Sequence, residues 1–337
     1  MTEIKLEELT PAAAHRDLVE VYGVVSGVQR EDLPDLPIPS FEAFAERMSV
    51  PTARIGPRRA WVARVDGTIV AVVMAYFPPA ENKHIGVVNV QVLPHMRRQG
   101  IGAALVRAAL PSLHADGRHV IASQGMREGS TGDIWARRHG FHPVHRVAVQ
   151  SLAVNDATNA LWQVSAPPEF RSLRWVDSTP DEFVVEYARA RTAITDAPTG
   201  DQSYTHPTWT VEQVRRHEAA ARAIGTKLYV VAAVHEPTGT IAGLTEMEMR
   251  VNETDRGHQE DTAVLPAFRG RGLGRYIKAE MMRWLTSEYP ALKSVITASA
   301  VENSHMIRVN RELGYVTDMV LVDLEADIED LAARLEP

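Results

Sequence analysis

One pattern of valine, proline, arginine and glycine occurs twice in this chain of 337 residues, and the interval between the two copies is constant. The paired positions are Val92 and Val264, Pro94 and Pro266, Arg97 and Arg269, Gly100 and Gly272, and Gly102 and Gly274. Each pair is 172 residues apart, and the tripeptide Gly-Thr-Ile recurs at the same interval, at residues 67–69 and 239–241. Chance does not keep one register over such a span. The sequence therefore predicts two copies of one domain, and the chain length is typical of two domains.

The second copy of the pattern reads as a strand, a glycine-rich loop and the first turn of a helix. Pro266 cannot continue a central strand, and the glycines that follow it allow backbone conformations that other residues avoid. From Leu273 to Leu285 the apolar residues recur with the spacing of one helical face. Free backbone N–H groups at the start of such a helix bind phosphate or pyrophosphate. The alternative is a glycine-rich turn that holds no ligand.

Two common phosphate-binding motifs do not fit this loop. A P-loop ends in Gly-Lys-Ser or Gly-Lys-Thr, whereas residues 273–275 are Leu-Gly-Arg. A dinucleotide fingerprint needs glycine or alanine at position 277, which is isoleucine. The arginine and glycine spacing of residues 269–274, after Val264-x-Pro266, resembles instead the acyl-coenzyme A (acyl-CoA) pyrophosphate loop of the GNAT superfamily of N-acetyltransferases. Two such units in one chain are similar to the tandem acetyltransferases of actinobacterial type, the group that includes mycothiol synthase.

This resemblance implies a fold and a co-substrate. The fold is two tandem GNAT domains, each a mixed, mostly antiparallel twisted sheet flanked by helices. The co-substrate is acetyl-CoA or another short acyl-CoA, which either loop could hold. The residues implied to bind it in the second copy are Val264, Leu265, Arg269, Gly270, Arg271, Gly272, Leu273, Gly274, Arg275 and Asn303. Those in the first copy are Val92, Leu93, Arg97, Arg98, Gln99, Gly100, Ile101 and Gly102.

The residue pattern also predicts the fold class and the domain limits. Strands and helices alternate around an antiparallel hairpin in each copy, which indicates an α/β chain with a mixed sheet. We expect an N-terminal domain at residues 1–154 and a C-terminal domain at residues 171–337. The asparagine and proline residues of 155–170 favour a linker between them. The last strand of each domain is expected at residues 144–154 and 316–324.

Composition narrows the classes of function. Apolar content of 45% and charged content of 23% are typical of soluble globular proteins, and the charged N-terminal residues lack a signal-peptide core, so we expect a cytoplasmic protein. A formal charge of −7 gives no reason to expect nucleic acid and mildly favours a cationic substrate. Zero cysteines exclude disulfides and thiolate chemistry. His139, His142 and His145 recur in an irregular stretch, where solvated histidines are favoured over a metal site, so we expect no metal.

The two copies differ in the residues that would face the thioester. The second copy carries Glu260 and Asp261 upstream of its loop, whereas residues 86–92 of the first copy contain no carboxylate. An amine must lose a proton to attack a thioester, and a carboxylate can accept that proton. We therefore expect at least one of Glu260 and Asp261 to act in catalysis or substrate binding. Glu246 and Glu248 on the preceding hairpin are further candidates, or they form the solvated face of that hairpin.

Two asparagines complete the expected catalytic set. The resemblance places Asn303 near the coenzyme and puts Asn310 where a tyrosine often lies. Asn310 cannot donate a proton as a tyrosine could, and Asn303 can also cap the helix that follows it. In the first copy the corresponding residues are Gly129 and Ala136, so both polar groups are lost. The expected catalytic residues are Glu260, Asp261, Asn303 and Asn310.

We interpret the protein as an acyl-CoA-dependent N-acyltransferase with its active site in the C-terminal domain. Acetyl transfer to a primary amine would occur by direct attack in a ternary complex, because no cysteine is available for a covalent intermediate. The resemblance implies a backbone oxyanion donor near Val264–Leu265, with its counterpart near Val92–Leu93. Two alternatives stay open: a non-catalytic acyl-CoA-binding or sensing protein, and catalysis in the N-terminal domain with the other domain as scaffold. The acceptor is a small-molecule or peptide amine, neither nucleic acid nor membrane is expected as a partner, and the protein is a monomer or a homodimer.

Overall fold

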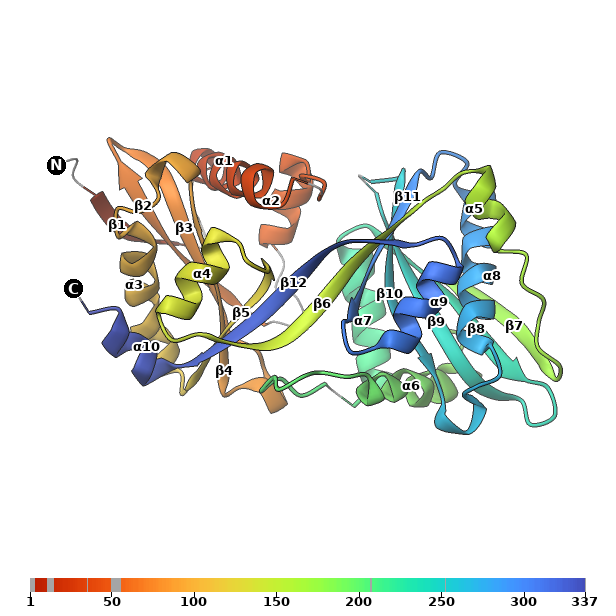
Figure 1. The fold of residues 1–337 in the computed structure, drawn as a ribbon. Coiled ribbons are helices and arrows are strands. Elements are labelled where there is room, and N and C mark those ends of the chain that lie inside the picture. Colours follow the sequence, from red (N-terminus) through yellow and green to blue (C-terminus); the bar gives the residue numbers. More distant parts are fainter. Residues whose placement is uncertain are drawn as a thin grey trace. The chain divides into compact units, whose positions relative to one another are not determined.

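A computed structural model describes residues 4–10, 15–34, 36–49, 56–206, 208–251 and 253–336 (Figure 1). The chain divides into two compact units. Unit 1 comprises residues 1–146, 200–205 and 321–337, and unit 2 comprises residues 147–199 and 206–320. No helix among the described residues is long and apolar enough to cross a membrane.

Unit 1 is a mixed sheet with helices on both faces. Its elements are β1 (Ile4–Leu9), α1 (His15–Asp32), α2 (Phe41–Ser49), β2 (Arg58–Val65), β3 (Thr68–Tyr76), β4 (Ile85–Val92), α3 (Ile101–Ala115), β5 (Val120–Arg127), α4 (Thr131–Arg138) and α10 (Ile328–Arg334), with short 3₁₀ turns η1 (Ala80–Asn82) and η2 (Pro94–Met96). The strand order is β1-β2-β3-β4-β5, followed by the end of β12 (Val316–Asp327). Only β4 and β5 are parallel among the pairings described in this unit.

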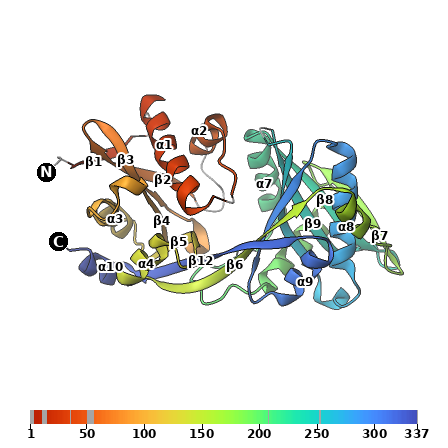
Figure 2. The same ribbon diagram turned by 45° about the horizontal axis from the view of Figure 1, so that its top comes forward.

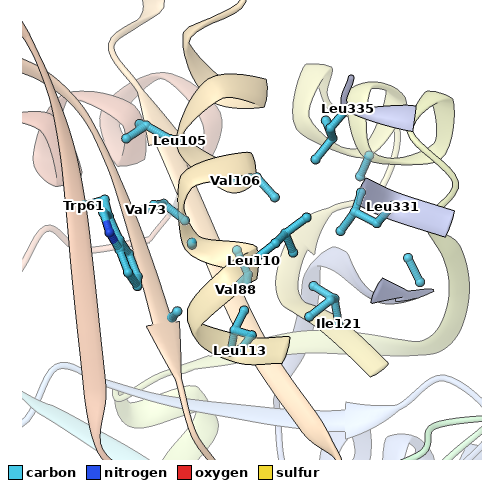
Figure 3. Close-up of a cluster of buried hydrophobic side chains, with 14 of the residues drawn as sticks. Trp61, Val73, Val88, Leu105, Val106, Leu110, Leu113, Ile121, Leu331 and Leu335 are labelled. Carbon is cyan, nitrogen blue, oxygen red and sulfur yellow. The ribbon is translucent and has the colours of Figure 1, made fainter. Parts of the chain in front are cut away.

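The core of unit 1 lies on the α3 face of its sheet. The apolar side of α3 packs on β3, β4 and β5 and on α10 (Figure 3). The labelled side chains of this cluster are Trp61, Val73, Val88, Leu105, Val106, Leu110, Leu113, Ile121, Leu331 and Leu335. A second apolar cluster joins α1 and α2 to the opposite face, so helices cover both faces of the sheet (Figure 1).

Unit 2 repeats this architecture. Its elements are the end of β6 (His142–Ala153), α5 (Asp156–Leu161), β7 (Phe170–Val176), α6 (Val184–Thr192), η3 (Ala193–Asp196), α7 (Val211–Ala223), β8 (Thr226–His235), β9 (Thr240–Arg250), β10 (Arg256–Val264), η4 (Pro266–Phe268), α8 (Leu273–Glu288), β11 (Ser294–Ala300), α9 (Ser304–Glu312) and the start of β12. The strand order is β6-β11-β10-β9-β8-β7, with β10 and β11 parallel. Helices α7 and α8 lie on opposite sides of β8 and β9 (Figure 2).

The predicted α/β fold class is confirmed, but the last strands are distributed in a way that the sequence did not indicate. Residues 321–327 of β12 pair antiparallel with β5 in unit 1, and residues 147–153 of β6 pair antiparallel with β11 in unit 2. Each sheet is therefore closed by the last strand of the other copy. The domain limits at 154 and 171 stay a prediction, and residues 156–161 of the expected linker form helix α5. An alternating strand carries no mark of which sheet edge it will join, so this exchange is visible only in the tertiary structure.

Candidate functional site

The two glycine loops have the same backbone geometry. Gly100 and Gly272 have φ angles of 77° and 78°, and helices α3 and α8 begin at the next residue. Neither glycine has a side chain that could cap its helix, and the first helical hydrogen bonds run from Ala104 N–H and Tyr276 N–H, at 3.0 and 3.1 Å. A Cβ placed on Gly272 would meet no heavy atom within 4 Å. Each loop thus presents uncapped N–H groups to open space, as an anion site requires.

The loops match even where their residues differ. Gly270 in the second loop has a φ angle of 77°, and the residue at the same position in the first loop, Arg98, has a φ angle of 66°. A left-handed arginine carries a conformational cost that glycine does not. Arg98 nevertheless adopts this conformation, so the two loops share one backbone geometry.

The motif arginines are bound within their own units. The Arg97 Nε donates to the Val92 carbonyl at 3.1 Å, and its two terminal nitrogens donate to the carboxylate of Asp32 at 2.9 and 2.8 Å. Arg269 repeats both contacts, to the Val264 carbonyl at 3.0 Å and to Asp196 at 2.5 Å. Both guanidinium groups brace the loop against a neighbouring helical turn. Their contact with coenzyme stays a prediction. The two bracing aspartates were not predicted, because no local pattern marks them.

The other predicted coenzyme residues contribute in different ways. Ile101 and Leu273 are buried in the apolar cores, so only their backbone N–H groups could reach a ligand. The residues of the two loops that are exposed are Arg98, Gln99, Gly100, Arg269, Gly270, Arg271 and Gly272. The Arg271 guanidinium lies 5.9 Å from the ring centroids of Phe170 and Phe268. The Arg275 Nε lies 3.6 Å from a carboxylate oxygen of Glu312.

The backbone donors expected for the oxyanion are partly occupied. The N–H of Leu265 donates to the Ala242 carbonyl at 2.9 Å, and the N–H of Leu93 donates to the Val70 carbonyl at 3.0 Å. These leucine N–H groups continue the pairing of the strands and are not free to bind a developing charge. The Leu265 and Leu93 N–H groups are therefore ruled out as this donor, and the wider expectation of a donor near Val264–Leu265 and Val92–Leu93 stays a prediction.

Unit 2 has a β-bulge at the predicted carboxylates, whereas the described pairing of β4 in unit 1 has no bulge at the matching place. In unit 2, Gln259 pairs with Met247 and Thr262 pairs with Thr245. Glu260 and Asp261 on β10 therefore both oppose a single residue of β9, Glu246. In unit 1, β4 pairs with β3 without a shift from Val87 to Val92. A bulge bends its strand and redirects its side chains, and bulges often lie beside active sites.

Beyond the bulge, the central strands of unit 2 separate. The parallel pairing of β10 with β11 ends at Gln259 and Thr297, although both strands continue for several residues. The equivalent pairing in unit 1 ends at Val87 and Ala122. Both sheets therefore open at the strand ends that lead into the glycine loops, but only the opening in unit 2 carries a bulge with carboxylates.

Glu246, which opposes the bulge, is a buried structural carboxylate. Its side chain is 1% exposed and accepts hydrogen bonds from the Tyr187 hydroxyl at 2.8 Å and from Arg191 at 3.2 Å, while a His217 ring nitrogen lies 3.2 Å away. Burial opposes its ionisation, but Arg191, His217 and Tyr187 outweigh burial and lower the pKa of Glu246 to about 2. The solvated-face interpretation of Glu246 is wrong, because the side chain is buried. A role as proton acceptor gains no support, because the carboxylate is already bonded to Tyr187 and Arg191.

Arg191 links Glu246 to the bulge. Its guanidinium is 3% exposed and donates to Glu246 and, at 3.2 Å, to Asp261. The ring of Trp209 lies 3.6 Å from the guanidinium carbon, in cation–π contact. Burial opposes the charge on Arg191, but Glu246, Tyr187 and Asp261 outweigh it and raise the pKa of Arg191. Asp261 is therefore held as an ion-pair partner, and sequence reasoning found neither Arg191 nor Trp209.

Glu260 is the bulge carboxylate that stays accessible. Its side chain reaches solvent, although protein surrounds the carboxylate on its other sides. Desolvation, followed by the negative charges of Glu248, Asp261 and Glu246, raises the pKa of Glu260 to about 8. A carboxyl group with this pKa exchanges its proton near neutral pH, which is the property a general base needs.

The two predicted asparagines have structural contacts. The Asn303 side chain accepts the Met306 N–H at 3.1 Å and caps α9, as the sequence allowed. Asn310 is fully buried, and its amide nitrogen donates to Gln150 at 2.8 Å. The oxygen of that amide has no partner among the described residues. A catalytic role for Asn310 therefore gains no support from its position, because the side chain does not reach an accessible surface.

An open groove of about 630 Å³ lies between α6, η3, the start of α7 and the two residues that follow β10. Its walls include Ala188, Thr192, Trp209, Val211, Leu265 and Pro266. Among the described residues, no three His, Asp or Glu side chains lie together as a metal site would require. The groove, the bulge carboxylates and the open start of α8 all belong to unit 2.

The sequence matches the family model described as acetyltransferase (GNAT) family, at residues 25–126 and 191–315. The chain belongs to the GNAT family. A tandem GNAT protein from the clavulanic acid biosynthesis pathway is similar over 97% of this chain and 99% of its own, with 22% identity and a TM-score of 0.79. A GCN5-related N-acetyltransferase from Sphaerobacter thermophilus is similar over 96% of both chains, with 16% identity and a TM-score of 0.72. A search of curated proteins finds no match.

The solved structures bear on the fold of this GNAT chain, and the family match bears on its superfamily and its class of reaction. The family match confirms the predicted superfamily. At such identities the solved structures share the tandem fold, which confirms the predicted architecture. The family match supports an acyl-transfer function, for which GNAT proteins generally use acetyl-CoA. The shape of both glycine loops, with free N–H groups facing open space, fits the pyrophosphate of such a coenzyme.

Proposed function

We propose that the protein is an acyl-CoA-dependent N-acyltransferase that moves an acetyl group from acetyl-CoA to a primary amine, with its active site in unit 2. The observation that carries this proposal is the bulge on β10, which presents the solvent-exposed Glu260 opposite the buried Glu246. Unit 1 has a similar glycine loop, but β4 has no register shift at the matching place and no carboxylate. The acceptor is a small-molecule or peptide amine, and the protein acts in the cytoplasm as a monomer or a homodimer.

The reaction follows from the groups in unit 2. The first turn of α8 holds the coenzyme pyrophosphate through its backbone N–H groups. The ionised Glu260 accepts a proton from the acceptor ammonium, directly or through one water molecule. The neutral amine then forms a bond to the thioester carbon and the carbon–sulfur bond breaks. The new amide nitrogen gives up its second proton, and that proton neutralises the departing coenzyme thiolate, directly or through water. Transfer is direct, since the chain has no cysteine to carry an acyl group.

Coenzyme binding by each unit can be tested with one substitution and one matched control. Gly274 and Gly102 are suitable positions, because neither has a positive φ angle and a new Cβ has room at both. Gly274→Asp places a carboxylate where the pyrophosphate would sit, and acidic residues suit the first turn of a helix, so the fold should be kept. Gly274→Ala adds the Cβ without the charge. Gly102→Asp and Gly102→Ala do the same in unit 1.

Titration calorimetry with acetyl-CoA and an assay of amine-dependent CoA release then separate the candidate functions. We expect Gly274→Asp to weaken binding at least about tenfold, equivalent to 1.4 kcal/mol, and to abolish release, while Gly274→Ala keeps both. Loss of release in Gly102→Asp alone would place catalysis in unit 1. Binding without release for any amine would favour a non-catalytic acyl-CoA-binding protein. Absence of binding by the wild type would refute the proposal.

A further inference from the structure

Trp209 forms a wall between the groove and the buried charges of unit 2. It lines the groove, and its ring also covers the Arg191 guanidinium at 3.6 Å. Its backbone N–H donates to the Thr192 hydroxyl at 3.2 Å, and its ring meets that of His217 edge-on at a centroid distance of 5.5 Å. Contacts with α6 and α7 therefore fix the indole in place. A ligand in the groove would meet an aromatic surface that is held before the ligand arrives.

The rest of the groove is short of free charge. Among the described residues that line it, only Arg189 and Asp196 are charged. Asp196 is paired with Arg269 at 2.5 Å, and Arg189 with Glu186 at 3.3 Å. The other walls are aliphatic side chains, threonines and the indole of Trp209. A polycation, an aminosugar or a charged peptide would lose water in this groove without gaining matching partners.

Charge at one side of the groove favours an ammonium group. The Arg191 guanidinium contacts both the Trp209 ring and the Asp261 carboxylate, and Glu260 lies next to Asp261 in the bulge. The carboxylates of Glu246 and Glu248 lie near Glu260 as well. These carboxylates outnumber the two arginines among them, Arg191 and Arg250, so this region is net negative when Glu260 is ionised. An amine whose body rests on the indole can therefore direct its ammonium group towards it. The volume of about 630 Å³ is within the range of small-molecule sites.

We infer that the groove binds a primary amine carried on an apolar, ring-sized body, and that Trp209 is the residue that selects this acceptor. The inference rests on the proposed function, because it names the substrate class of that same site. Aromatic amines such as 2-phenylethylamine and tryptamine are the simplest members of the class. The indole supplies a flat apolar contact for the ring, and Glu260, the bulge carboxylate that Arg191 does not hold, receives the ammonium group.

The test is a selectivity ratio measured at saturating acetyl-CoA. We expect kcat/KM for 2-phenylethylamine to exceed that for ethylamine at least about tenfold, and spermidine, glucosamine and a lysine peptide to be poorer than 2-phenylethylamine. Trp209→Ala should lower the ratio of 2-phenylethylamine to ethylamine about tenfold, mainly through KM. Trp209→Phe, which keeps an aromatic wall, should restore most of it. Trp135→Phe is the matched control, because it replaces an indole by a phenyl ring in α4 of unit 1, outside the residues that line the groove. It should leave the ratio of 2-phenylethylamine to ethylamine unchanged.

The outcomes distinguish this inference from the proposed function. CoA release with spermidine, glucosamine or the peptide in preference to aromatic amines would overturn the inference and leave the acyltransferase proposal standing. A tenfold weaker acetyl-CoA affinity in Trp209→Phe, with the selectivity ratio unchanged, would assign the groove to the coenzyme and also overturn it. Failure of every amine to release CoA would refute both.

Discussion

The pH dependence of acetyl transfer tests the assignment of Glu260 directly. Its pKa is raised to about 8 by desolvation and by the carboxylates of Glu248, Asp261 and Glu246. With this pKa, about one tenth of the enzyme carries an ionised Glu260 at pH 7. Because the ionised form accepts the proton, kcat/KM should rise with pH through a midpoint near pH 8 and level off above about pH 9.

Glu260→Gln removes the acceptor with little change in shape. We expect kcat/KM at the plateau to fall about 10²–10⁴-fold, and the rise with a midpoint near pH 8 to disappear. CoA release is followed from pH 6 to pH 10 with one amine. Ionisation of that amine affects the wild type and the variant equally, so the difference between the two profiles isolates Glu260.

Glu248→Gln is the matched control, since it changes a neighbouring carboxylate and leaves the proposed base in place. Loss of that negative charge makes ionisation of Glu260 easier, so the midpoint should move to lower pH while activity at the plateau is retained. A Glu260→Gln variant that keeps both its rate and its midpoint would refute the assignment. A midpoint that moves to higher pH in Glu248→Gln would refute the electrostatic explanation of the raised pKa.

Two further predictions concern stability. Lys278 is 2% exposed in α8, and burial lowers its pKa to about 7, so the wild type should gain stability as pH rises from 7 towards 10.5. Lys278→Met should stabilise the fold by about 1–4 kcal/mol at pH 7 in urea unfolding, with a gap that narrows at higher pH; destabilisation would contradict this. Glu246→Gln leaves Arg191 partly unpaired and should cost about 3–5 kcal/mol. Because the pKa of Glu246 is lowered from 4.5 to about 2, its contribution is present above pH 4.5 and lost as pH falls towards 2, so the variant should lack this slope; a parallel slope would contradict it.

Sequence reasoning located the loops but not the contacts that hold them. The repeat of Arg97, Gly100 and Gly102 at a constant interval predicted two equivalent turns, and both have the left-handed glycine before a helix. Glycine spacing is a local signal, because it reports which backbone angles a turn needs. The partner of Arg269 is 73 residues away in sequence, and nothing near Asp196 marks it as that partner.

For the carboxylates, too, the sequence showed the residue types and the tertiary structure showed their roles. Residue types alone singled out Glu246, Glu248, Glu260 and Asp261, but they left the roles open. The bulge, the burial of Glu246 and its contact with Arg191, 55 residues away in sequence, decided which carboxylate is structural and which stays accessible. The sequence specifies which residues are carboxylates, whereas the pKa of each carboxylate depends on the groups that surround it in the folded protein.

The sequence by itself therefore determined the duplication, the fold class, the superfamily and the two glycine loops, because each depends on short-range patterns or on a repeated register. Only the tertiary structure decided which strand closes which sheet, that Trp209 and Arg191 share a site with the bulge, and that Asn310 is buried. These features depend on contacts between residues far apart in the chain. Such contacts form through burial and shape, and no local spacing encodes them.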